Sequence, residues 1–273
     1  MKKQVNYRKT TSDYIYKELI SFFKPEQYRD VVRNGLLLDN TDIIEKVYTA
    51  TFSSSQALEK IKQDKAEHCL LFTHHPGAQH KDGEQAVYFS QEERAYMEEH
   101  HISHFNLHLP LDHINPYSPG ICFARELGAV PYKSFFNEGG SVMGLYCSGK
   151  WTDARTLFEE VGRVMGHACR LYAYGPSELE DGKFALIAGG AEGTKIYREM
   201  KEEGVNLFLT GVGSPKLDWF APSHEAAMEE KVSILSAGHY STEHFALKYM
   251  CRFFGERGLK AEFIPETPLL DDL

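Results

Sequence analysis

The sequence predicts an α/β fold whose sheets are at least partly parallel. Short apolar runs rich in strand-forming residues alternate along the chain with longer runs of helical period, which is typical of this class. The 273 residues are 42% apolar and 25% charged, which is the balance of a globular protein. A chain of this length accommodates one large α/β domain or two small ones.

These two patterns place the elements in chain order. An amphipathic helix is expected first, at 11–23, and a strand at 46–51 follows it. The run H-C-L-L-F-T at 68–73 has the pattern of a buried strand, which Pro76 ends. The remaining strands are expected at 102–107, 141–147, 184–188, 207–210 and 233–236, and the remaining helices at 54–64, 91–99, 119–127, 152–165, 193–204, 222–230 and 241–255.

A change of character at 131–140 predicts a domain boundary, because this segment has neither the helical nor the strand period. The pairing of the motifs described below suggests that the last helix and residues 260–264 return to the first domain. The first domain is therefore expected to be discontinuous, with residues 1–130 plus 237–273, and the second domain to span residues 131–236.

Composition limits the compartment and the partners. Thirty Lys and Arg against 39 Asp and Glu give a formal charge of −9 without a long basic run, so nucleic-acid or membrane-surface binding is not expected. The N-terminal segment lacks the apolar core of a secretory signal, and no apolar run approaches the roughly 20 residues of a membrane span. Five widely spaced cysteines without a C-x-x-C pair indicate reduced thiols. We expect a cytoplasmic protein.

Histidine is the unusual residue of this composition. There are 13, and eight of them lie between residues 74 and 113: His74, His75, His80, His100, His101, His104, His108 and His113. Such a concentration favours a shared site, although most histidines in proteins bind no metal.

Three predicted strands end in possible metal ligands, at the edge where open α/β sheets usually bind ligands. The strand at 68–73 leads to His74 and His75, whose side chains point to opposite sides of an extended backbone and can serve two ions. The strand at 102–107 leads to His108 and Asp112, and the aspartate is a possible bridging ligand.

The third strand, at 233–236, leads through Gly238 to a helix on which His239 and Glu243 lie four residues apart, on one face. Imidazoles mixed with carboxylates favour zinc, manganese, iron, cobalt or nickel over calcium or magnesium. Two ions about 3.5–4 Å apart would turn a bridging water into a nucleophile at neutral pH.

Each signal also has a structural interpretation. The histidine pair can simply follow a strand, Asp112 can be a turn residue after Pro110, and Glu243 can be a favourable carboxylate in the first turn of a helix. The conjunction of three strand ends favours the metal site. The aromatic residues Tyr172, Tyr174, Trp219 and Phe220 can stack on a heterocycle or pack in the core.

The three segments resemble the signature blocks of the NIF-three-like family, whose bacterial members are often labelled GTP cyclohydrolase I type 2 homologues. The blocks are T-H-H-P at 73–76, H-L-P-L-D at 108–112 and G-H-Y-S-T-E at 238–243. Weaker landmarks are N-G-L at 34–36, G-G at 189–190 and T-G at 210–211, so the resemblance spans nearly the whole chain.

The resemblance implies two interlocking α/β domains with mixed sheets, two divalent transition-metal ions per chain, and a toroidal homohexamer whose metal sites face an internal cavity. The ligands that it implies are His74, His75, Asp112, His239 and Glu243, with His108 nearby, behind the ligands or against the substrate. Two departures from the family pattern are the lack of an acidic residue at 49–54 and Val212 where an acidic side chain is usual.

These observations favour a metal-dependent hydrolase acting on a small molecule, similar to the GTP cyclohydrolase I type 2 homologues, in which a metal-activated water is the nucleophile. Glu243 or His108 is expected to shuttle a proton. The alternative is a non-catalytic ring protein that binds, stores or delivers metal.

Overall fold

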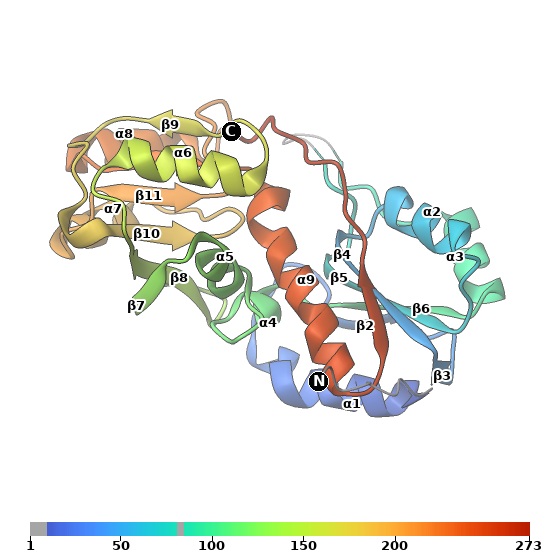
Figure 1. Cartoon of the computed structure of the whole chain (residues 1–273). Helices are drawn as coiled ribbons and strands as arrows, with labels where there is room; N and C mark the ends of the chain where they lie inside the picture. Colours follow the sequence, from blue (N-terminus) through green and yellow to red (C-terminus); the bar gives the residue numbers. More distant parts are fainter. Residues whose placement is uncertain (1–9, 81–84) are drawn as a thin grey trace.

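The fold consists of two sheets with helix α9 (His239–Glu256) between them (Figure 1). A computed structural model describes residues 10–80 and 85–273. The first sheet has the strand order β13 (Lys260–Phe263), β4 (Lys46–Phe52), β5 (Cys69–His75), β6 (Ile102–Asn106) and β2 (Gly35–Leu38). Its first four strands are parallel and β2 is antiparallel. A small ribbon, β1 (Thr10–Thr11) with β3 (Ile43–Ile44), lies beside it.

Helices cover both faces of this five-stranded sheet. Helices α1 (Ser12–Phe23) and α9 pack on one face, and α2 (Ser55–Gln63) and α3 (Gln91–Glu99) pack on the other. Leu70 and Phe72 of β5 contact the first pair, whereas Leu71 contacts the second pair, because successive strand side chains point to opposite faces. Burial on both faces explains why this strand is a continuous apolar run in the sequence.

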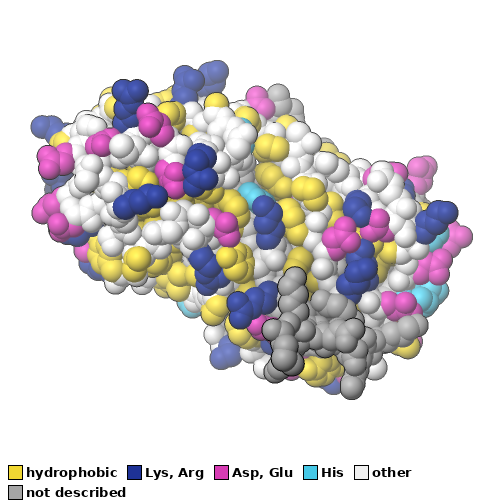
Figure 2. Space-filling view, viewed as in Figure 1, with side chains coloured by type: hydrophobic (Ala, Val, Ile, Leu, Met, Phe, Trp, Pro, Cys, Tyr) yellow, Lys and Arg dark blue, Asp and Glu magenta, His cyan; other side chains and the backbone are white. Residues whose placement is uncertain are grey.

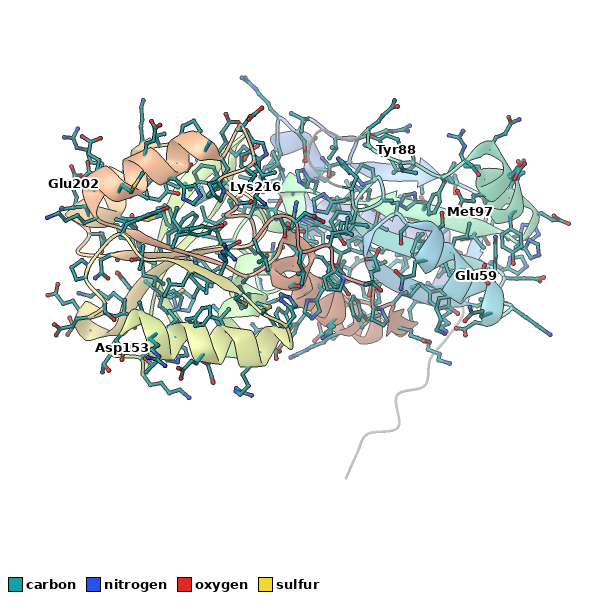
Figure 3. The ribbon with its side chains drawn as sticks, turned by 90° about the horizontal axis from the view of Figure 1, so that it is seen from above. Glu59, Tyr88, Met97, Asp153, Glu202 and Lys216 are labelled. Atoms are coloured by element: carbon teal, nitrogen blue, oxygen red, sulfur yellow. The ribbon has the colours of Figure 1, made fainter. Side chains whose placement is uncertain are left out.

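The second sheet has the order β7 (Val130–Glu138), β8 (Ser141–Ser148), β10 (Lys183–Ile187), β11 (Leu207–Thr210), β12 (Ser233–Ser236) and β9 (Arg170–Tyr172). Strands β10, β11 and β12 are parallel and the other pairings are antiparallel. Helices α5 (Pro119–Leu127) and α6 (Ala154–Met165) pack on one face, and α7 (Lys195–Glu202) and α8 (Ala221–Glu230) on the other. Asp153 and Glu202 accordingly lie on opposite sides of the sheet in Figure 3.

The structure confirms the predicted α/β class with mixed sheets and changes several elements. Residues 131–140 are not an irregular connection: they form most of β7 and the turn at Gly139 and Gly140. Strand β7 lies at the sheet edge with most side chains exposed, so the sequence has no burial alternation there. Helix α9 begins at His239, two residues before the predicted start. Strands β2 and β9 were not predicted; they are only four and three residues long, and their side chains are mostly half-buried.

The domain limits stay a prediction, but the chain's path is clear. Strand β13 pairs with β4 in the first sheet, far from its neighbours in sequence. Helix α5 precedes the predicted boundary, yet it packs on the second sheet. Helix α9 contacts both cores, through Phe245 on one side and Leu247 on the other. Both sheets therefore pack against α9, and the first turn of this helix lies where the ends of their strands meet.

Two further observations concern the surface. None of the helices within residues 10–80 and 85–273 combines the length and the hydropathy that crossing a bilayer requires. On the face shown in Figure 2, basic and acidic side chains are interspersed, without one large basic area. An extended basic face is the usual footprint of nucleic-acid binding, and this face lacks it.

Candidate metal centre

The carboxyl ends of strands from both sheets bring the predicted ligands together. His74 and His75 are the last two residues of β5, and Asp112 ends the short helix α4 (Leu109–Asp112) that follows β6. His239 and Glu243 lie in the first turns of α9, which follows β12. Gly238 joins β12 to the helix with φ of 87°, a conformation that glycine adopts without a steric penalty.

His74 is fully buried and its ring orientation is determined by the backbone. Its Nδ1 lies 2.9 Å from the carbonyl oxygen of Leu107, and a carbonyl only accepts, so Nδ1 carries the proton. Its Nε2 has no hydrogen-bond partner and lies 3.4 Å from Asp112 Oδ1 and 3.5 Å from Glu243 Oε1. When His74 is neutral, its Nε2 lone pair points at two carboxylates, an arrangement that a bound cation would stabilise.

Glu243 lies between the imidazoles. Its Oε2 is 2.9 Å from His75 Nε2 and its Oε1 is 3.1 Å from His239 Nε2. Burial opposes the ionisation of this side chain, but the three surrounding imidazoles hold the pKa of Glu243 well below its usual range. Glu243 is thus an anion shared by two groups of possible ligands, whereas Asp112 belongs to one.

The imidazoles differ in their preference for a proton. Burial opposes the charged form of His74, but Asp112 and Glu243 raise its pKa well above the ordinary value. Burial dominates at His75 and holds its pKa well below the ordinary value. At His239 burial is outweighed by Glu243, and the pKa is raised.

His108 lies close enough to His74 and His75 to be a metal ligand itself. Its Nδ1 donates to Asp30 Oδ1 at 2.9 Å, and Asn34 Oδ1 accepts from its backbone nitrogen at 2.7 Å. This arrangement leaves Nε2 free to accept, and His108 forms one possible ligand group with His74 and His75. A carboxylate behind a ligating or proton-carrying imidazole is a recurrent arrangement, and the sequence reasoning did not identify Asp30.

Three groups in the described part of the chain could hold a metal ion, each with ligand atoms within 4.8 Å of one another. They are His74, His75 and His108; His75, His239 and Glu243; and His74, Asp112 and Glu243. The residues therefore fit a transition-metal site by their N and O donors, their proximity and the unpartnered nitrogen of His74. All five predicted ligands lie in these groups.

Gly189 allows the close approach of Glu243. It has φ of 72°, and a Cβ built there would overlap Glu243 Oε1 and lie 3.4 Å from His239 Nε2. Only glycine fits between β10 and the carboxylate. Gly189 of the G-G pair at 189–190 therefore shapes the cluster.

The C-terminal segment holds both sides of the site. Glu266 accepts hydrogen bonds from the backbone nitrogens of Thr51 and Phe52 at 3.0 and 3.1 Å and from Ser54 Oγ at 2.8 Å. An acidic side chain thus lies at the end of β4, where residues 49–54 supply none. The backbone oxygen of Asp272 accepts from Gly213 in the second sheet's loop at 2.8 Å. Neither carboxylate was identified from the sequence.

Most of the remaining histidines have structural contacts. His104 is buried against Ser53 Oγ and Thr73 Oγ1 at 2.9 and 2.8 Å, and burial lowers its pKa to about 3. His68 and His101 stack on each other, with ring centroids 4.5 Å apart. His113 Nδ1 accepts from the backbone nitrogen of Val142. The concentration of histidines in the sequence therefore overstates the size of the site.

Comparison with known proteins identifies the family of this chain. A family model described as Duf34/NIF3 (NGG1p interacting factor 3) matches residues 10–268. The chain belongs to the Duf34/NIF3 family. This confirms the resemblance seen in the sequence.

Relatives of this Duf34/NIF3 protein carry the name "GTP cyclohydrolase 1 type 2 homolog". One from Neisseria meningitidis serogroup A is 26% identical over 234 residues, which cover 84% of this chain and 86% of the relative. One from Borreliella burgdorferi is 27% identical over 248 residues, which cover 90% and 94%. A solved structure from Thermus thermophilus has a TM-score of 0.74 at 21% identity and covers 94% of this chain and 99% of that chain, which shows a shared fold.

Proposed function

We propose that this protein is a metal-dependent hydrolase of a small molecule. The observation that carries the proposal is the buried Nε2 of His74, which has no hydrogen-bond partner and faces Asp112 and Glu243. His74, His75, Asp112, His239 and Glu243 would hold two divalent transition-metal ions. Bound ions would supply Lewis acidity and lower the pKa of water, which provides a nucleophile for hydrolysis at neutral pH.

We assign the proton transfer to His108. The hydrogen bond from its Nδ1 to Asp30 fixes the tautomer of the His108 ring and leaves Nε2 facing the cluster. Nε2 can then accept a proton there and return it. Both oxygens of Glu243 are already occupied by imidazoles, so we assign Glu243 to holding the ions. GTP is a candidate substrate only because relatives carry the cyclohydrolase name.

The first experiment measures metal in protein purified without a histidine tag. About two transition-metal equivalents per chain are expected, and Glu243→Gln and Asp112→Asn should reduce them. His101→Gln is the matched control, because His101 is exposed and stacks on His68 away from the cluster. A protein that takes up no metal, even after reconstitution, contradicts the proposal.

The second experiment measures turnover of GTP, phosphoesters and amides by the metal-loaded protein. His108→Gln should lower kcat by about 10²–10⁴-fold if His108 carries the proton, at unchanged metal content. If the protein binds metal but turns over none of these substrates, the result favours the alternative of a non-catalytic metal-binding protein.

We also propose the toroidal homohexamer that the family resemblance implied and the cytoplasmic location that the composition and the cysteine pattern predicted. Exposed Val130 and Tyr132 on the edge strand β7 support self-association, since apolar side chains on an unpaired edge favour contact with another chain. Light scattering coupled to size-exclusion chromatography measures the oligomeric state, and a monomer at micromolar concentration contradicts this part of the proposal.

A further inference from the structure

A cavity of about 310 Å³ adjoins the possible metal ligands. His75 and His239 form part of its wall, and Phe52, Tyr88, Val212 and Trp219 supply apolar walls. Phe52 stacks on the His75 ring at 4.5 Å, with 11° between the planes. The cavity therefore joins an aromatic surface directly to the ligand cluster.

We propose that this cavity binds a compact, flat organic group that carries no negative charge. The inference rests on the proposed function for the role of the cluster as the reacting end of the site. The volume is at the lower end of the roughly 300–1,000 Å³ that small-molecule sites occupy, which favours a ligand of one or two rings. Aromatic walls such as Trp219 and Phe52 favour a flat group, because stacked or edge-to-face rings attract each other.

Charge determines which flat group fits. A second cavity of about 230 Å³ shares Val212, Trp219 and His239 with the first. Among the described residues that line the two cavities there is no Lys or Arg, and even when Asp271 is left out of the count there are five carboxylates: Asp112, Glu138, Glu192, Glu243 and Asp272. Two divalent ions would offset four of these five negative charges.

The site therefore keeps a negative balance even with both proposed ions bound. A nucleoside triphosphate would bring several more negative charges, and none of the described lining residues is a Lys or Arg that could meet them, whereas a neutral or cationic ring meets no such repulsion. Lys216 is exposed and is not among the lining residues.

Part of the cavity wall lies outside the family match. Leu269, Asp271 and Asp272 line the cavity, but the Duf34/NIF3 model ends at residue 268. Hydrogen bonds from Gly213 and Ser214 to the backbone oxygen of Asp272 fix this wall at 2.8 and 3.1 Å. The preference for ligands without negative charge is thus built partly from residues of this chain that the family model does not cover.

Calorimetric binding to the metal-loaded protein tests the inference with two probes of similar shape and opposite charge. At about 0.15 M salt, phenyltrimethylammonium should bind at least about tenfold more tightly than benzenesulfonate. It should also bind more tightly than GTP. Trp219→Ala should weaken phenyltrimethylammonium binding several-fold, while Tyr14→Ala, an exposed aromatic residue on α1, should leave it unchanged. Glu192→Gln should narrow the difference in affinity between the two probes, and Asp13→Asn, which changes an exposed carboxylate on α1, should not.

The inference is overturned if benzenesulfonate or GTP binds as tightly as phenyltrimethylammonium, if no probe binds, or if Trp219→Ala has no effect. These results are separate from the proposed function. Metal uptake with turnover but a preference for the anion would refute the charge argument alone, whereas a cation preference in a protein that cannot hold metal would refute the hydrolase alone.

Discussion

The side chain of Asp272 caps the helix that carries two of the possible metal ligands. Its Oδ2 accepts a hydrogen bond from the backbone nitrogen of His239 at 2.8 Å. Gly238 precedes the helix and offers no side chain for this purpose, so the cap comes from a segment 33 residues later. The position of the His239 imidazole therefore depends on the C-terminal segment.

Replacement of Asp272 should affect both stability and metal binding. Asp272→Ala is expected to lower the free energy of unfolding by about 0.5–2 kcal/mol, the usual effect of losing a helix cap, and to weaken metal binding. Asp272→Asn keeps an acceptor oxygen and should recover most of both. Urea unfolding and metal titration against a competing chelator measure the two effects.

Asp153→Ala is the matched control for that prediction. Asp153 caps α6 by accepting from the backbone nitrogen of Thr156 at 2.9 Å, and it lies on a helix of the second sheet. Its loss should cost similar stability and leave metal binding unchanged. Equal loss of metal affinity in the two variants would show that global stability, not the position of His239, controls the site.

Gly189→Ala should expel metal without unfolding the protein. The new Cβ would overlap Glu243 Oε1 and force that carboxylate away from His75 and His239. Elemental analysis should show a large loss of bound metal, while circular dichroism should show a folded protein.

Gly128→Ala separates this clash from backbone strain. Gly128 has φ of 73°, close to the 72° of Gly189, but a Cβ there meets no atom within 4 Å. Both variants carry the left-handed strain of about 1–2 kcal/mol, and only Gly189→Ala carries the clash. Metal loss in the Gly128 variant as well would attribute the effect to strain.

Metal binding should depend on the protonation of His74. Because Asp112 and Glu243 raise the pKa of His74 despite its burial, the metal-free protein holds this proton above pH 6.5, and the proton competes with metal. Metal affinity is therefore expected to increase with pH through and beyond 6.5. Competition titrations from about pH 5.5 to about pH 9 measure this slope, and a flat profile would contradict it.

Histidine NMR of the metal-free protein tests whether the neighbouring carboxylates cause the raised pKa of His74. Asp112→Asn removes one of the two carboxylates beside His74 and should shift its titration to lower pH. His104 is the internal reference, since burial lowers its pKa to about 3 and it should stay neutral in both proteins.

Glu266 should make stability fall as pH rises from about 4.5 to 7. Burial raises the pKa of Glu266 from 4.5 to about 7, against the hydrogen bonds from Ser54, Phe52 and Thr51. The folded state then holds a proton that the unfolded state has released, so the loss reaches up to about 3 kcal/mol at pH 7 and above. Urea unfolding of Glu266→Gln, which has no charge to bury, should lack this component; identical pH profiles for both proteins would contradict it.

The sequence was sufficient for the fold class and for the set of possible ligands. Buried parallel strands such as β5 leave continuous apolar runs, and turns after them leave Pro and Gly, so the segments that lead to His74, Asp112 and His239 were recognisable. Edge strands were harder: most side chains of β7 are exposed, and its sequence therefore has no period to detect.

Tertiary structure determined which other residues contact those ligands and strand ends. Asp30, Gly189, Glu266 and Asp272 are each separated from the ligand or strand end that they contact by tens to hundreds of residues, so local patterns carry no signal of these contacts.

The same holds for the site as a whole. The amino-acid sequence by itself determined which strands end in imidazoles and carboxylates, because burial and turn chemistry are local properties. Only the packing of two sheets on α9 decided that Glu243 lies between three histidines and that an apolar cavity with an excess of carboxylates adjoins them. Long-range pairing positions these groups, and a single sequence does not encode it in any local pattern.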